Sequence, residues 1–477
     1  MYNSLCGYLI CHAFPRVGKE RFAGCSAPWK IYRGGYCCHR PRHGHGRAYS
    51  LAHLITKYGL HLLWLALLGI TFQYFINQEV ARYSLATGES FFTSTARLSK
   101  WFAPFWFFAG ILLYMWPGWA SAIGTTLREL TGFGSHLSWA YATLGLVLVM
   151  TFSGKIAYHL LEKSLKIIVP AFFLLLVFIS FYNLNISDVS EALRGLVNFG
   201  GIPKDIDVNV LLGAIVFAGA GGMLNLCVSL WYRDKGLGMG HYAGRITNPI
   251  TGAVQAVSPS GFEFETSEEN IKKWKKWMKY VRIDQGLIFW FLGLVTLVML
   301  SLNAYVVLTP KGLVPEGLNI AVVQAHIFGD KMGPVGYNLF LFMAFLMLFS
   351  VMWTVIDALT RITGDIIHTN SRVGPWSTGL LGKLSRVSLS HLYYILITLF
   401  VIIGALLLPL KQPLTLLNTS AVLGGLTMAV YTPILMYLNN FKLHKKMRPG
   451  ILTNIFMAFA SLFFLFFAWR IIVENIF

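Results

Sequence analysis

One apolar run in this sequence is interrupted by residues of the kind that bind ions. Residues 208–231 are apolar apart from a cluster of small residues at 218–222, with Asn225 just beyond it. Clustered glycines weaken a helix by about 1 kcal/mol each and leave backbone carbonyls free to face a cavity. We therefore predict a discontinuous helix whose ion or substrate pathway is lined by Gly219, Gly221, Gly222 and Asn225. Close packing of small residues between helices is the alternative explanation.

The donor atoms at this break determine which ions suit it. The amide of Asn225 and the exposed backbone carbonyls offer oxygen ligands only. Oxygen suits Mg²⁺, Ca²⁺ or Mn²⁺, whereas Cd²⁺ gains most from sulfur. We expect Asn225 to be a metal ligand and Cd²⁺ to have no strong advantage. Beyond a transported ion, the sequence implies no cofactor.

Two pairs of opposite charges lie within apolar surroundings. Glu79 and Arg82 are three residues apart on one expected helix, where they either gate the inner mouth of a pathway or fasten the helix end. Asp357 and Arg361 are four residues apart, which favours an ordinary ion pair at a helix end. Of the two pairs, Glu79 and Arg82 are therefore the candidates for an inner gate.

An intramembrane enzyme is a weaker alternative. A di-iron enzyme needs a Glu/His pair on each of two helices and further glutamates. Only His159 and Glu162 have that spacing. We therefore expect no enzymatic activity.

The elements that would position these residues are membrane helices. The chain has 477 residues, of which 56% are hydrophobic, 15% aromatic and 12% charged, a composition that a water-exposed globule could not carry. Continuous apolar blocks predict helices, because barrel strands would alternate over roughly ten residues. Ten such blocks occur, around residues 60–75, 101–123, 139–152, 167–182, 208–231, 287–308, 339–356, 392–408, 414–438 and 451–472.

The distribution of Lys and Arg orients these helices. Basic residues gather in alternate loops, at 155–163, 233–282, 361–386 and 442–448, which predicts that these loops are cytoplasmic. The net charge of +19 therefore reflects topology and attraction to the lipid bilayer, not nucleic-acid binding. We expect a multi-pass protein of the cell membrane, and the sequence leaves its oligomeric state open.

The long loop at 232–282 has structure of its own. Glycines at 236–240 predict a flexible linker, and Ser267 with two following glutamates predicts a helix start. Ile271, Trp274, Met278 and Val281 then recur at helical spacing among lysines. We expect a basic amphipathic helix on the cytoplasmic leaflet.

A family resemblance rests on the order of several landmarks. The run Glu79–Glu89, with its Arg and its Thr-Gly pair, resembles the end of the second helix in Nramp-type divalent metal transporters. Further landmarks follow in the same order: Ile123-Gly124-Thr125, Leu161-Glu162, the glycine break before Asn225, Asn303 and Pro433. The resemblance covers about residues 51–477 and implies an all-α, LeuT-like bundle of two inverted repeats. The implied function is secondary transport of a divalent cation by alternating access. A permease of the same fold for an amino acid or other small solute, or an inactive or truncated transporter, are the alternatives.

The family's site residues carry over only in part. Its Met-Pro-His-Asn motif aligns with residues 222–225, so only Asn225 matches, and the resemblance implies that Met at position 222 would raise Cd²⁺ affinity. Its two proton-pathway acids align with Gly118 and Ser121, which argues against proton coupling by that route. Its tenth-helix Gln aligns with Ala421, and Asn418 and Thr419 become the expected pathway residues there.

The first 50 residues differ from the rest, and the first of the family's eleven helices is missing. This segment is basic and rich in Cys and His, which leaves a zinc site or a transit peptide open. A third explanation is a frameshift, because the codons for residues 35–47 permit an apolar Gly/Asp-Pro-Gly string in another frame. We expect residues 1–50 to form no native membrane helix, and residues 51–477 to form a single transporter domain.

Overall fold

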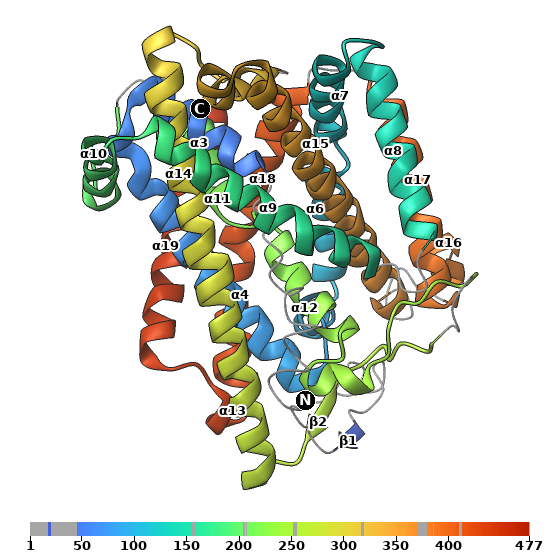
Figure 1. Cartoon of the computed structure of the whole chain (residues 1–477). Helices are drawn as coiled ribbons and strands as arrows, with labels where there is room; N and C mark the ends of the chain where they lie inside the picture. Colours follow the sequence, from blue (N-terminus) through green and yellow to red (C-terminus); the bar gives the residue numbers. More distant parts are fainter. Residues whose placement is uncertain are drawn as a thin grey trace.

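The computed structural model describes residues 18–20, 45–153, 159–203, 206, 208–250, 255–315, 319–370, 379–384, 386–409 and 413–476. Within this part, the protein is a bundle of helices with one pair of short strands (Figure 1). Continuous apolar runs form helices because a helix satisfies its own backbone hydrogen bonds without water.

The bundle begins earlier than the sequence predicts. Helix α3 (His45–Tyr58) precedes η1 (Leu60–Leu62) and α4 (Leu63–Thr87) and packs against α11 (Val208–Ala218) and α14 (Gly293–Leu308). Its Leu51 and Ile55 are completely buried, so a short helix of the bundle precedes the first predicted apolar block. With 14 residues, α3 is about 21 Å long and too short to cross roughly 30 Å of hydrocarbon. Apart from its start and strand β1 (Gly18–Glu20), residues 1–50 lie outside the described residues.

The next helices end where the local sequence dictates. Helix α4 stops at Gly88, whose φ of 70° is a left-handed cap, and Ser90 caps α5 (Phe91–Leu98) by accepting from the Thr93 N–H. An interruption at Pro117 separates α6 (Phe102–Tyr114) from α7 (Gly118–Thr131). Helix α7 then packs against α8 (His136–Phe152).

The middle of the chain contains the broken helix. Helix α9 (His159–Asn183) is followed by α10 (Ile186–Val197), which is bent from it by 118°. Helix α11 stops at Ala218, and α12 (Leu224–Asp234) resumes after the small residues. The predicted discontinuity of this segment is confirmed.

The loop after α12 differs from expectation in two ways. The expected flexible linker is the short helix η2 (Gly238–Tyr242), whose first three residues are buried against α4 and α12. Strand β2 (Phe262–Phe264) pairs in parallel with β1. Helix α13 (Glu268–Ile283), capped by Ser267 as predicted, continues through η3 (Asp284–Leu292) and α14 to Lys311 as one helical stretch of 44 residues (Figure 1). Its Ile271, Trp274, Met278 and Val281 are buried in the protein, so protein packing and not a lipid surface accounts for this apolar stripe.

The last third of the chain completes the bundle. Helix η4 (Thr309–Lys311) leads to α15 (Ile320–Asn370), which is interrupted at Gly333 with φ of 62° and packs against α7. Helices α16 (Gly379–Leu384) and α17 (Leu389–Leu407) follow. Helix α18 (Pro413–Tyr437) ends in the π-helical η7 (Leu438–Lys442), and η8 (Lys445–Met447) connects it to α19 (Ile451–Ile476).

The membrane-length helices of the described residues match the predicted apolar blocks. Seven helical stretches are long and apolar enough to span a membrane, and α9 with α10 is an eighth candidate. Helix α8 and the broken α11 are apolar but shorter. Together these elements account for all ten blocks that the sequence predicts. The predicted cytoplasmic segment 233–282, with β2 and α13, lies at the same end of the bundle as the C-terminal end of α4 (Figure 1).

Candidate ion site at the broken helix

Two glycines give the broken helix its shape. Gly221 has φ of 77° and Gly222 has φ of 52°, a left-handed backbone that strains any other residue. A Cβ on Gly222 would also lie 2.9 Å from the Gly424 backbone of α18. A methionine here would require a shift of that helix, so packing disfavours the Met substitution expected to raise Cd²⁺ affinity.

Two tyrosines replace hydrogen bonds that the helix loses at the break. The Tyr114 hydroxyl, from α6, donates to the Gly221 carbonyl at 3.2 Å and accepts from the Leu224 N–H at 2.8 Å. The Tyr431 hydroxyl, from α18, donates to the Gly222 carbonyl at 3.1 Å and accepts from Asn225 Nδ2 at 3.0 Å. Each hydroxyl therefore bridges a glycine carbonyl to a donor at the start of α12.

Gln73 of α4 joins the two halves. Its Nε2 donates to the carbonyls of Val216 (2.9 Å) and Ile215 (3.3 Å), near the end of α11. Its Oε1 accepts from the Gly221 N–H at 2.9 Å and from Asn225 Nδ2 at 3.3 Å. The side chain is completely buried, so all of these bonds form away from water.

Asn225 is the predicted ligand, and the structure places it at the centre of this cluster. It is completely buried and donates to Gln73 and Tyr431 through Nδ2. Its Oδ1 is buried and accepts no hydrogen bond from any described residue. A buried carbonyl oxygen without a donor costs about 1–3 kcal/mol, and a cation is the kind of group that satisfies it.

The remaining predicted pathway residues divide into two groups. Gly219 lies directly against Gln73, within the cluster. Asn418 and Thr419 belong to α18, but their side chains lie outside the described residues. Ala421 faces Gly213 in the middle of α11, because a Cβ on Gly213 would lie 3.4 Å from it. Gly424 and Tyr431 of α18 contact Gly222 at the break, and the roles of Asn418 and Thr419 stay a prediction.

The positions aligned with the family's acids carry no charge in this fold. Gly118 is the first residue of α7 and Ser121 is buried one turn later. The structure thus adds no acidic group at these two positions.

The predicted Glu79–Arg82 ion pair is present, and it lies nearer the C-terminal end of α4 than Gln73 does. Arg82 Nε lies 2.9 Å and 3.0 Å from the two Glu79 carboxylate oxygens, and each residue is 2% exposed. Asn439 of η7 donates to the same carboxylate at 2.7 Å, and Arg82 donates to the Met447 carbonyl at 2.9 Å. The pair therefore fastens α4 to the connection between α18 and α19. Whether it also gates a pathway stays a prediction.

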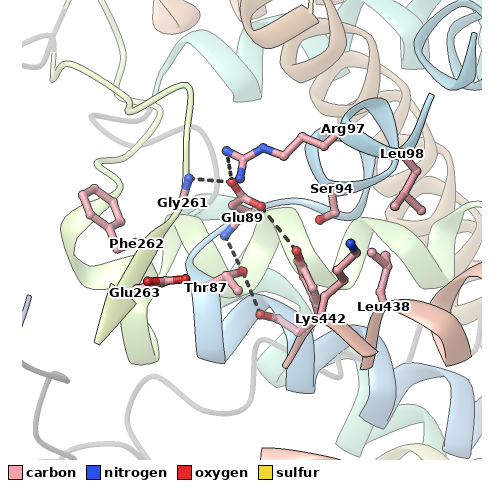
Figure 2. Close-up of a pocket in the computed structure, with 11 residues that line it drawn as sticks. Thr87, Glu89, Ser94, Arg97, Leu98, Gly261, Phe262, Glu263, Leu438 and Lys442 are labelled. Carbon is pink, nitrogen blue, oxygen red and sulfur yellow. Dashed lines mark hydrogen bonds and ion pairs between the residues drawn. The ribbon is translucent and has the colours of Figure 1, made fainter. Parts of the chain in front are cut away.

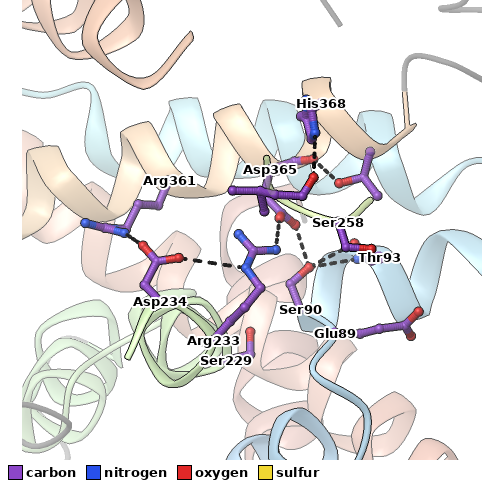
Figure 3. Close-up of polar contacts among 12 residues, drawn as sticks. Glu89, Ser90, Thr93, Ser229, Arg233, Asp234, Ser258, Arg361, Asp365 and His368 are labelled. Carbon is purple, nitrogen blue, oxygen red and sulfur yellow. Dashed lines mark hydrogen bonds and ion pairs between the residues drawn. The ribbon is translucent and has the colours of Figure 1, made fainter. Parts of the chain in front are cut away.

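The predicted Asp357–Arg361 ion pair is confirmed, with Arg361 Nε 2.8 Å from the carboxylate. It belongs to a larger network in which Arg361 also pairs with Asp234 of α12. The neighbouring Arg233 lies 2.5 Å from Asp365 of α15, which accepts from the Ser90 hydroxyl at 2.5 Å (Figure 3). All of these groups are buried or nearly so, and they hold α12 against α15 and the start of α5.

A pocket of about 240 Å³ lies beside this network. Glu89 lies on its wall, accepts a hydrogen bond from the Gly261 N–H at 2.8 Å and forms an ion pair with Arg97 at 2.5 Å (Figure 2). Burial raises the pKa of the Glu89 carboxyl, although Arg97 and the Gly261 N–H act in the opposite direction. Lys442 and Glu263 line the same pocket, so its wall carries charges of both signs.

Sequence reasoning missed Gln73, Tyr114 and Tyr431. Gln73 could have been noticed as a polar residue in an apolar helix, which in a membrane indicates a functional partner. The tyrosines give no such signal, because aromatic residues are common throughout this chain.

Comparisons with known proteins agree on the family and the fold. The family model described as "Natural resistance-associated macrophage protein-like" (Nramp) matches residues 56–474. None of the curated proteins matches the sequence.

Solved transporters share the fold at low identity. A variant of the manganese transporter of Eremococcus coleocola is 12% identical with a TM-score of 0.67, over 96% of this chain and 90% of that chain. MhsT in complex with L-phenylalanine is 14% identical with a TM-score of 0.58, over 94% and 100%. Mhp1, a nucleobase-cation-symport-1 family transporter, is 13% identical with a TM-score of 0.56, over 97% and 96%.

These likenesses confirm the predicted LeuT-like helical bundle. The family match covers most of the chain and agrees with the landmarks read from the sequence. The chain belongs to the Nramp-like family.

Proposed function

We propose that this protein is a secondary transporter that moves a divalent metal cation across a membrane by alternating access. Family membership supports transport and not catalysis. The observation that carries the proposal is the buried Asn225 Oδ1, which accepts no hydrogen bond from a described residue and lies at the break beside Gly221 and Gly222. Broken membrane helices present such oxygens to ions near the middle of the bilayer.

The ligand chemistry points to a hard cation. Asn225 and the glycine carbonyls are oxygen donors, and oxygen favours Mg²⁺, Mn²⁺ or Ca²⁺ over softer ions. Met223 has a thioether next to the glycines in the sequence. The methyl group of its side chain is directed toward α6, near Gly110. We therefore infer that the site gives Cd²⁺ no strong preference over Mn²⁺.

The break is the proposed transport pathway, and the Glu79–Arg82 pair is its proposed inner gate. Both oxygens of Glu79 and two donors of Arg82 are engaged, so any opening there must break the contacts to Asn439 and Met447. The basic loops place this end of the bundle in the cytoplasm by the positive-inside rule, in a lipid bilayer that we infer to be the cell membrane.

Uptake by reconstituted vesicles tests the proposal. Purified protein in liposomes should accumulate Mn²⁺, Mg²⁺ should compete, and Asn225→Ala should lower uptake by at least about tenfold, which corresponds to a loss of about 1.4 kcal/mol. Asn440→Ala is the matched control, because that amide pairs with Asn454 between η7 and α19. Competition by L-amino acids and none by Mg²⁺ would instead establish the same-fold permease.

A further inference from the structure

We propose that the Gln73 amide occupies the cation position of the broken helix in the ion-free protein, and that amide and cation take this position in turn. The inference rests on the proposed function and adds a residue from a different helix. Gln73 would then determine both the structure of the ion-free site and how readily a cation binds there.

The first observation concerns the amide nitrogen. Ile215 and Val216 are among the last four residues of α11, whose carbonyls have no partner within that helix. This end of a helix carries partial negative charge and attracts cations. Gln73 Nε2 donates to both carbonyls, at 3.3 Å and 2.9 Å, and thereby supplies the positive group that this helix end requires.

The second observation concerns the fit of the amide against the break. A Cβ on Gly219 would lie 1.9 Å from both Cδ and Oε1 of Gln73. Only glycine at this position leaves room for the amide. Gly219 does not have a positive φ, so backbone conformation does not require glycine there, unlike at Gly221 and Gly222. The Gln73 amide fills the space that a side chain at residue 219 would need, which explains the glycine there.

The third observation is that a rotation of the amide converts the cluster into a cation site. In the structure, Gln73 Oε1 accepts from Asn225 Nδ2 at 3.3 Å. Rotation about the last side-chain bond exchanges Oε1 with Nε2, because the amide carries an acceptor and two donors in one plane. Oε1 would then face the same space as the Ile215 and Val216 carbonyls. The rotated Oε1 and the two carbonyls are neutral oxygens, which suit a hard divalent cation, and the rotation breaks the bonds of Oε1 to the Gly221 N–H and Asn225 Nδ2.

Substitutions at Gln73 test this exchange by calorimetric titration with Mn²⁺. Gln73→Lys places a tethered cation at the carbonyls and should abolish Mn²⁺ binding. Gln73→Glu cannot donate to the carbonyls and adds a charged ligand, so it should bind Mn²⁺ about tenfold more tightly. Gln78→Lys and Gln78→Glu are matched controls on the same helix, at a residue that is also buried. Wild-type affinity in both Gln73 variants would overturn the inference.

A spectroscopic readout covers the case in which a variant does not fold. In protein labelled with ¹³C at the glutamine amides, Mn²⁺ should shift one amide carbonyl band in the infrared difference spectrum. The band should vanish in Gln73→Met and persist in Gln78→Met. Mn²⁺ binding that depends on Asn225 but leaves this band unshifted would overturn the exchange and leave the proposed function standing. A wild-type protein that binds no Mn²⁺ would remove the proposed function and the exchange together.

Discussion

Asn439 donates a 2.7 Å hydrogen bond to the carboxylate of Glu79, although the two residues are 360 positions apart. The same carboxylate holds Arg82, so three polar groups of two distant segments form one buried unit. Such a unit is stable only while every charge has its partner.

Removing one charge of this unit should cost more than removing both. Glu79→Gln leaves Arg82 buried without a counter-charge and should lower the free energy of unfolding by about 3–5 kcal/mol. The double variant Glu79→Gln/Arg82→Met should recover most of that loss. Chemical denaturation of the purified variants measures both values. If the pair also gates the pathway, uptake per folded molecule falls in the double variant even where stability is restored.

Substitutions in the buried ion-pair network around Arg361 should lower the free energy of unfolding by different amounts. Arg361→Met leaves Asp234 and Asp357 without their shared cation and should destabilise by about 3–5 kcal/mol. Asp357→Asn should cost less, because Arg361 retains Asp234 and the single oxygen of the new amide can still accept from the Tyr393 hydroxyl. Asp330→Asn is the control, since its pair with Lys311 is exposed and contributes about 1 kcal/mol or less. Equal losses for Arg361→Met and Asp357→Asn would contradict the network as described.

The two tyrosines at the break should be needed for stability in equal measure. Tyr431→Phe and Tyr114→Phe each remove a hydroxyl that satisfies one glycine carbonyl and one donor. We expect each change to cost about 1–3 kcal/mol of unfolding free energy. Tyr437→Phe, at a half-exposed ring near Lys442, should be neutral. Thermal unfolding monitored by intrinsic fluorescence distinguishes these variants.

Much of the fold could be predicted, because membrane helices need long apolar runs and glycine clusters interrupt them. Helix α3 was not predicted, because its short sequence contains polar as well as apolar residues. Its structure depends on packing against α14, which the sequence does not show. The position of the break was predictable, but its partners were not. Gln73 and Tyr431 come from helices far away in the sequence, and no local pattern pairs them with the break.

Stability should depend on pH through Glu89. Because burial raises its folded-state pKa above the ordinary value of 4.5, the folded protein binds this proton more tightly than the unfolded chain. The resulting stabilisation is present below pH 4.5 and is lost as pH rises through the raised pKa. The melting temperature of wild type should therefore fall relative to that of Glu89→Gln as pH increases from 4.5. The opposite slope would mean that Arg97 outweighs burial.

The location of a bound cation tests the central claim most directly. Crystals or frozen grids of the protein with Mn²⁺ should show one ion at the break, roughly 2.0–2.6 Å from Asn225 Oδ1, as expected for oxygen ligands. In crystals, anomalous scattering at the manganese edge identifies the ion. An ion bound elsewhere while vesicles accumulate Mn²⁺, or an unchanged break at saturating Mn²⁺, would contradict this account.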